Sequence, residues 1–137
     1  MTRFSLCLLI LLVGCTSSEK KGDSNSSSTE IIVLAPADFK SQFSKTSDAV
    51  LIDVRKPEEF SEGIISGADN IDFTAPDFTN KIAGLDRSKP YFVYCKSGKR
   101  SADAVSQMKE MGFKNLYTLD GGLNNWKDQG LEIVKPD

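Results

Sequence analysis

A lone cysteine at the head of a short basic stretch is the strongest chemical signal in the sequence. The stretch reads Cys95-Lys96-Ser97-Gly98-Lys99-Arg100-Ser101, and no acidic residue follows it before Asp103. Nearby positive charge favours the thiolate, which is the nucleophilic form of cysteine, and it attracts small anions. The stretch therefore predicts a nucleophilic cysteine in an anion-binding loop. On these residues alone, a solvated basic turn beside a buried structural cysteine explains the pattern equally well.

The flanking segments determine where this stretch would lie. Residues 91–94 form an apolar run typical of a buried strand, and residues 102–111 have the apolar periodicity of a helix. Ligands of open α/β sheets bind beyond the carboxyl ends of strands, and N–H groups at a helix N-terminus bind anions. We therefore expect Cys95 to be catalytic. The residues expected to bind the substrate are Lys96, Ser97, Gly98, Lys99, Arg100 and Ser101.

The rest of the body alternates short apolar runs with amphipathic stretches. Strands are expected at residues 31–34, 49–52, 70–73, 91–94 and 115–119. Helices are expected at residues 36–45, 57–62, 77–85 and 102–111, with a last one that carries Leu123 and Trp126 and ends at Gly130. This alternation predicts an α/β fold with a central parallel sheet of about five short strands and helices on both faces.

Composition excludes several classes of function. The chain has 137 residues, 39% of them hydrophobic, and a formal net charge of −2, as expected of one globular domain that does not bind nucleic acid. Histidine is absent, which excludes His-dependent triads and His metal sites. Three cysteines cannot form a four-cysteine zinc site, so we predict no metal.

The first residues indicate export. Arg3 precedes a mostly apolar run over residues 4–13, which suits a signal peptide and is too short to span a membrane. The run ends in Leu12-Val13-Gly14-Cys15, which resembles the lipobox of bacterial lipoproteins. We therefore predict a signal peptide over residues 1–14, cleavage before Cys15 and lipidation of Cys15. An uncleaved anchor or a buried terminal helix is the alternative.

The residues after Cys15 predict a tether. Residues 16–29 are rich in serine and have no large apolar side chain, so they cannot bury enough surface to offset the entropy of ordering. We expect residues 15–29 to be a lipidated, flexible tether and residues 30–137 to be the folded domain. The protein would then be anchored to a membrane in the bacterial cell envelope, on the periplasmic side. Cys95 would be its only free thiol.

Four stretches, in the same order along the chain, resemble the motifs of single-domain rhodaneses, a family of sulfurtransferase modules. They are residues 52–55, 59–71, 95–101 and 112–126. The resemblance covers about residues 31–134 and implies a rhodanese-like fold. One position departs from the family: the second motif commonly has histidine after its glycine, and this chain has Ile64. That departure implies a change in local packing or at the entrance to the site.

The resemblance also implies a double-displacement mechanism. Cys95 would take a sulfane sulfur from a small anionic donor such as thiosulfate and pass it, as a persulfide, to a thiol or cyanide. Backbone N–H groups of residues 96–101 would hold the persulfide, while Lys99 and Arg100, together with Lys96, would attract and orient the donor. The mechanism needs no cofactor. No protein partner is indicated.

Two other functions stay open. The domain could be a non-catalytic module that carries a persulfide or binds a partner. It could also be a Cys-dependent phosphatase or arsenate reductase. The loop of those enzymes is one residue longer, with Cys-x5-Arg where this chain has Cys95-x4-Arg100. The shorter loop resembles the sulfur-handling class.

Other polar residues favour structural roles. For Asp53 and Arg55 we expect an ion-pair network with Glu59 or with a loop backbone rather than catalysis. Glu59, together with its neighbour Glu58, is expected to stabilise the first turn of a helix. The pair Gly121-Gly122 is expected to form a turn before the last helix.

Overall fold

A computed structural model describes residues 28–137. The predicted signal peptide, the predicted lipidation site Cys15 and most of the predicted tether lie outside the described residues. Over residues 28–137, no helix has both the length and the apolar character needed to cross a membrane.

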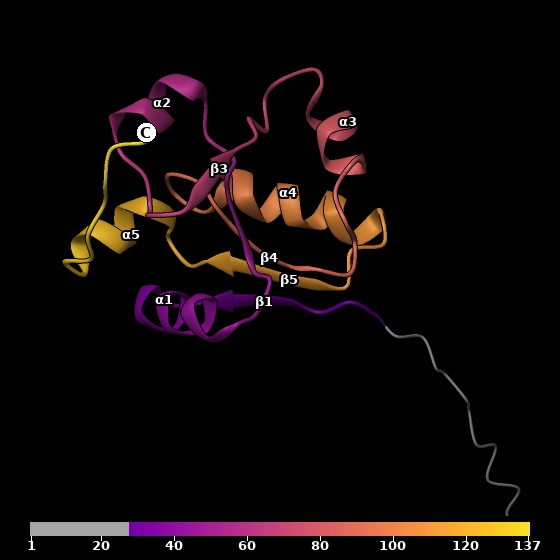
Figure 1. Cartoon of the computed structure of the whole chain (residues 1–137), viewed down its shortest axis with the longest axis horizontal. Coiled ribbons are helices and arrows are strands. Elements are labelled where there is room, and N and C mark those ends of the chain that lie inside the picture. Colours follow the sequence, from indigo (N-terminus) through magenta and orange to yellow (C-terminus); the bar gives the residue numbers. More distant parts are fainter. Residues whose placement is uncertain (1–27) are drawn as a thin grey trace, which may run out of the picture.

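The domain is built on one sheet of five parallel strands (Figure 1). In chain order the strands are β1 (Ile31–Leu34), β2 (Val50–Asp53), β3 (Ala68–Asn70), β4 (Pro90–Tyr94) and β5 (Asn115–Leu119). The helices between and after them are α1 (Pro36–Lys45), α2 (Pro57–Glu62), α3 (Phe78–Ala83), α4 (Lys99–Glu110) and α5 (Gly122–Asp128). The spatial order of the strands is β1-β5-β4-β2-β3, so β4 lies at the centre.

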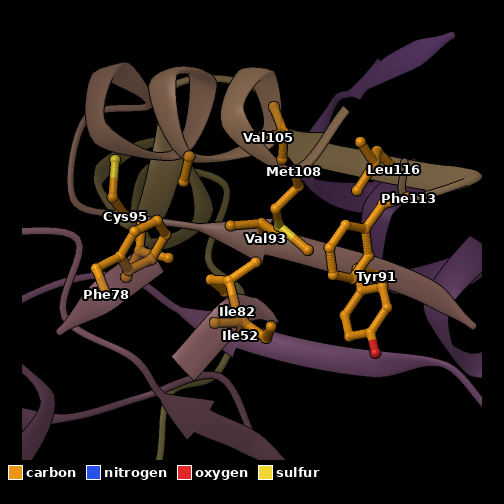
Figure 2. Close-up of a cluster of buried hydrophobic side chains, with 12 residues drawn as sticks. Ile52, Phe78, Ile82, Tyr91, Val93, Cys95, Val105, Met108, Phe113 and Leu116 are labelled. Carbon is orange, nitrogen blue, oxygen red and sulfur yellow. The ribbon is translucent and has the colours of Figure 1, made fainter. Parts of the chain in front are cut away.

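Helices cover both faces of the sheet and bury two separate cores. On one face, Val93 and Cys95 pack with Val105 and Met108 of α4 (Figure 2). On the opposite face, Phe92 and Tyr94 belong to a second core that includes Phe39, Leu123 and Trp126. Consecutive residues of β4 alternate between the two cores, because successive side chains of a strand point to opposite faces. The predicted α/β fold, with a parallel sheet between helices, is confirmed.

The structure corrects one predicted strand. The brief strand expected at residues 70–73 lies instead at Ala68–Asn70. Asp72 forms a turn, since its carboxylate accepts hydrogen bonds from the backbone N–H and the hydroxyl of Thr74, each at 2.8 Å. β3 therefore stops before Asp72, with Asn70 paired to Asp53 at the end of β2.

The start of α4 is also corrected. The helix expected at residues 102–111 begins at Lys99, directly after Gly98. Gly98 has a φ of +98°, a left-handed conformation that glycine tolerates best, and its carbonyl accepts the N–H of Ala102 at 3.1 Å. Lys99, Arg100 and Ser101 are therefore the first turn of the helix rather than part of a loop.

Candidate active site

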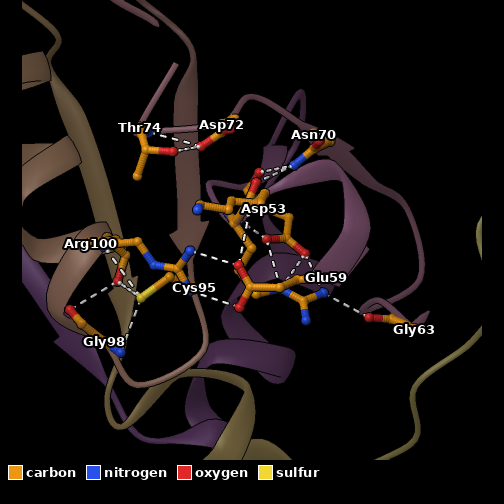
Figure 3. A network of polar contacts seen from close by, with 12 residues as sticks. Asp53, Glu59, Gly63, Asn70, Asp72, Thr74, Cys95, Gly98 and Arg100 are labelled. Carbon is orange, nitrogen blue, oxygen red and sulfur yellow. Dashed lines mark hydrogen bonds and ion pairs between the residues drawn. The ribbon is translucent and has the colours of Figure 1, made fainter. Parts of the chain in front are cut away.

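Cys95 occupies the point where the central strand meets the start of α4. It follows β4 directly, and the residues that lead into the helix wrap around its sulfur (Figure 3). This is the carboxyl end of a strand in a parallel sheet, where ligands of such folds bind. The structure thus places Cys95 where the sequence predicts it.

The sulfur of Cys95 lies among hydrogen-bond donors. The backbone N–H of Gly98 donates to Sγ at 3.1 Å, and that of Ser101 donates at 3.4 Å. The Ser101 hydroxyl lies 3.5 Å from Sγ, donates to the Gly98 carbonyl at 3.1 Å and accepts from the Thr118 hydroxyl at 3.2 Å. The two aimed N–H groups stabilise negative charge on the sulfur, whereas the Ser101 hydroxyl gives its proton to the Gly98 carbonyl and accepts from the Cys95 thiol. Thr118 lies on β5, and the sequence does not predict its contact with the site.

The sulfur is enclosed as well as hydrogen-bonded. Cys95 and Ser101 each have 0% exposed surface, and Cys95 borders the core that contains Phe78 (Figure 2). Two surface hollows, of about 230 Å³ and 600 Å³, are lined by residues from other parts of the domain. A reactant can therefore contact this sulfur only after a neighbouring group moves.

Arg100 forms an ion pair that the sequence does not predict. Its guanidinium donates to the two carboxylate oxygens of Glu59 at 2.7 Å and 3.0 Å (Figure 3). The hydrogen bond from Arg100 lowers the pKa of Glu59 from 4.5 to about 2, and Glu59 in turn raises the pKa of Arg100. Glu59 therefore pairs with Arg100, and of the two partners expected for the network of Asp53 and Arg55, Glu59 or a loop backbone, the loop backbone is the one observed.

The structural role predicted for Asp53 and Arg55 is confirmed. The Arg55 Nη2 atom lies 2.7 Å from Asp53 Oδ2 and donates to the carbonyl of Gly63 at 2.7 Å. Burial is the largest single effect and opposes the charge on Arg55, but the hydrogen bonds to Asp53 and the Coulomb attraction of nearby acidic groups, Asp53 first, together outweigh it and raise the pKa of the guanidinium. Asn70 completes the network by donating to the carbonyls of Asp53 and Arg55, both at 2.9 Å. This network fixes the segment that follows β2.

The N-terminus of α5 supports the cysteine loop from behind. The backbone N–H of Leu123 donates to the Cys95 carbonyl at 2.8 Å, and that of Asn124 donates to the Lys96 carbonyl at 3.0 Å. A Cβ at Gly122 would lie 2.6 Å from the Lys96 carbonyl oxygen, so only glycine fits this approach. The predicted turn before α5 is present, but its contact with the loop is a feature that the sequence does not predict.

The remaining predicted binding residues lie at the surface of the loop. Lys96, Ser97 and Lys99 are exposed, and neither lysine has an ion-pair partner among residues 28–137. Their ammonium groups are thus available to attract an anion.

Ile64, at the position that departs from the rhodanese motif, is buried and exchanges two 2.8 Å backbone hydrogen bonds with Val134. The structure gives Ile64 a role in packing.

The described part of the chain gathers no group of three His, Cys, Asp or Glu residues that could hold a metal ion. What the site does offer is a hydrogen-bonded cysteine sulfur near the exposed ammonium groups of Lys96 and Lys99. Such an arrangement suits nucleophilic attack followed by stabilisation of an anionic sulfur.

Comparison with known proteins assigns the family of the domain. Residues 35–129 match the family of the rhodanese-like domain. The chain is 37% identical over 94 residues to thiosulfate sulfurtransferase GlpE of Stutzerimonas stutzeri, covering 68% of this chain and 84% of that protein. A sulfurtransferase of Allochromatium vinosum is 29% identical over 92 residues, covering 67% and 84%.

A solved structure agrees with these relatives. The crystal structure of a rhodanese-related protein from Thermoplasma volcanium has a TM-score of 0.66 and 29% sequence identity to this chain. The match covers 75% of this chain and 97% of that chain. Together the relatives support sulfur transfer as the general class of reaction.

Proposed function

The chain belongs to the rhodanese-like domain family, and we propose that it is a sulfurtransferase that carries a sulfane sulfur on Cys95. The observation that carries the proposal is the pair of backbone N–H groups, of Gly98 and Ser101, aimed at the Cys95 sulfur. Such donors stabilise a thiolate before the reaction and a persulfide after it. The sulfurtransferase names of the relatives support the same class of reaction.

The first half-reaction loads the cysteine. The Cys95 thiolate attacks the outer sulfur of thiosulfate, a new S–S bond forms, and the S–S bond of thiosulfate breaks. Cys95 becomes a persulfide anion and sulfite leaves as a dianion, so the total charge of −3 is the same before and after. The exposed Lys96 and Lys99 attract the donor, while the start of α4 stabilises the sulfur that remains.

The second half-reaction regenerates the thiolate. A nucleophile such as cyanide attacks the outer sulfur of the persulfide, the S–S bond breaks, and thiocyanate leaves with Cys95 again a thiolate. A thiol acceptor would take the same sulfur and become a persulfide itself. Neither half-reaction needs a general base once the thiolate has formed, which is consistent with a chain that has no histidine.

The complete burial of Cys95 favours a second candidate, a module that holds a persulfide or binds a partner without turnover. The two candidates differ in one measurement. The purified protein and its Cys95→Ala variant are incubated with thiosulfate, intact masses are measured, and thiocyanate is followed after cyanide is added. We expect one added sulfur on the parent protein only, followed by repeated turnover.

The other outcomes have definite meanings. A persulfide without turnover supports the carrier, and the absence of any added sulfur contradicts the proposal and directs attention to phosphatase and arsenate assays. The variant must keep the parent's circular dichroism spectrum for the comparison to hold.

We also propose that the protein is anchored to the cell envelope through a lipid on Cys15. The proposal rests on the apolar run and lipobox-like residues at the start of the sequence. Fractionation of cells that produce the parent or the Cys15→Ala variant tests it. We expect the parent in membranes and the variant released from them. Retention of the variant in membranes would indicate an uncleaved anchor.

A further inference from the structure

The guanidinium nearest the reactive sulfur is already neutralised. Arg100 lies in the first turn of α4, and its side chain extends beside Cys95 to reach Glu59 (Figure 3). The side chains of Arg100 and Glu59 are 25% and 26% exposed, so the pair faces solvent at the site rather than lying in the core. A two-oxygen contact of this kind fixes the guanidinium in place and cancels most of its charge at longer range.

The other positive charges around the site do not replace the neutralised charge of Arg100. Arg55, the next guanidinium, is buried and paired with Asp53. Lys96 and Lys99 are exposed, have flexible side chains and have no ion-pair partner among residues 28–137 that would hold them toward the sulfur. The site therefore offers directed N–H groups and two mobile ammonium groups to a donor, and no unpaired guanidinium among the described residues near Cys95.

We propose that Glu59 is a specificity-determining positioning residue. By holding and neutralising Arg100, it makes the site favour sulfane donors with a single negative charge over thiosulfate, which carries two. The proposal rests on the sulfur transfer proposed above and names the charge class of donor that this chain prefers.

The effect should depend on donor charge in a simple way. The Coulomb energy between Glu59 and a bound donor is proportional to the charge of the donor. Removal of one unit of negative charge should thus help a dianion twice as much, in free energy, as a monoanion. Glu59 and the donor interact through a largely aqueous path. A gain in kcat/KM of about threefold for the monoanion then implies a gain of about tenfold for the dianion. The gain for the dianion should be close to the square of the gain for the monoanion.

Two donors of matched chemistry make the comparison. Thiosulfate loads Cys95 and releases sulfite, whereas methanethiosulfonate, with a methyl group in place of one oxygen, loads Cys95 and releases methanesulfinate. In the second reaction the thiolate attacks the outer sulfur and the donor S–S bond breaks, with a total charge of −2 on both sides. The donors differ by one unit of charge and deliver the same sulfur.

The experiment measures kcat/KM for both donors in the parent and in Glu59→Gln, with cyanide as the acceptor. Glu58→Gln is the matched control, because Glu58 is the exposed neighbour on the same helix and its loss changes net charge equally. We expect Glu59→Gln to raise kcat/KM about tenfold for thiosulfate and about threefold for methanethiosulfonate, mainly through a lower KM. We expect Glu58→Gln to change the ratio of the two donors by less than about twofold.

A second variant tests the same idea if loss of Glu59 disturbs the loop. Glu59→Gln/Arg100→Gln removes both charges, so the ratio of thiosulfate to methanethiosulfonate should return to the parent value. A ratio that stays unchanged in Glu59→Gln, or that changes equally in Glu58→Gln, would overturn the proposal. Failure of the proposed function gives a different result, because then neither donor adds sulfur to Cys95 of the parent.

Discussion

The contact between α5 and the cysteine loop can be tested by replacing Gly122 with alanine. Gly122 has a φ of +60°, and its added Cβ would lie 2.6 Å from the carbonyl oxygen of Lys96 and 2.7 Å from that of Cys95. Both neighbours are backbone atoms of the active-site loop, so they cannot rotate away as a side chain would. The substitution must therefore push the loop and α5 apart.

The magnitude follows from two separate effects. A non-glycine residue in the left-handed conformation costs about 1–2 kcal/mol. Separation of α5 from the loop also weakens the Leu123 and Asn124 hydrogen bonds to it, each worth about 0.5–1.5 kcal/mol. Gly122→Ala should lower the free energy of unfolding by about 2–5 kcal/mol in total.

Gly130→Ala separates the two effects. Gly130 has a φ of +73°, but no described atom outside its neighbours lies within 4 Å of its added Cβ. This control should lose only the conformational part, about 1–2 kcal/mol. Urea unfolding gives both free energies, and the thiosulfate–cyanide assay gives activity under conditions where both variants are folded.

Activity distinguishes the variants further. A displacement of the reacting group by about 1 Å can lower a rate about 100-fold, so Gly122→Ala should lose at least about tenfold in kcat/KM while Gly130→Ala keeps the parent value. Equal losses of stability and activity in the two variants would refute the reasoning, because α5 would then give the loop no specific support.

Two further predictions concern the ion pairs. Asp53→Asn leaves the buried guanidinium of Arg55 without its charge partner, so it should lower the free energy of unfolding, measured by urea unfolding, by about 3–5 kcal/mol. Its control is Asp77→Asn, which removes the exposed pair with Lys81 and should lower the same free energy by at most about 1 kcal/mol. The pKa of Glu59 is lowered from 4.5 to about 2 by Arg100, so its stabilising contribution is complete above pH 4.5 and is lost as pH falls toward 2. Urea unfolding at pH 7 and at lower pH should therefore show a stability difference between the parent and Glu59→Gln that shrinks on acidification, and a difference that grows would contradict the assignment.

The order of elements along the chain could be predicted because buried parallel strands have a simple sequence pattern. Residues 91–94 are apolar on both faces, and the structure shows why, since Phe92 and Val93 belong to opposite cores. The shift of β3 was harder to predict, because Ile71 and Phe73 alternate with Asp72 as a strand would. The turn becomes visible only in the structure, where Thr74 donates two hydrogen bonds to the Asp72 carboxylate and the N–H of Ala75 donates to the Asp72 carbonyl.

The site was predictable in part. A cysteine after a buried strand, followed by a glycine and a helix, locates the loop and its likeness to anion-binding loops. The sequence cannot say which N–H groups reach the sulfur, because that depends on the left-handed conformation at Gly98, which turns the N–H groups of Gly98 and Ser101 inward. The hydroxyl of Thr118 reaches Ser101 only because β5 pairs with β4, with Thr118 opposite Val93.

The Glu59–Arg100 pair marks the limit of prediction from a single sequence. The first-turn role expected of Glu59 is present, since its carboxylate accepts the backbone N–H of Lys56 at 3.1 Å, and that role alone accounts for the residue type. The second role follows from the strand order: β2 and β4 are adjacent and parallel, with Asp53 opposite Tyr94, so the segments that follow them emerge at one edge. Alternating strands and helices predict a parallel sheet but not which strands are neighbours. Opposite charges after two strands therefore become a signal for an ion pair only when the order of those strands is known.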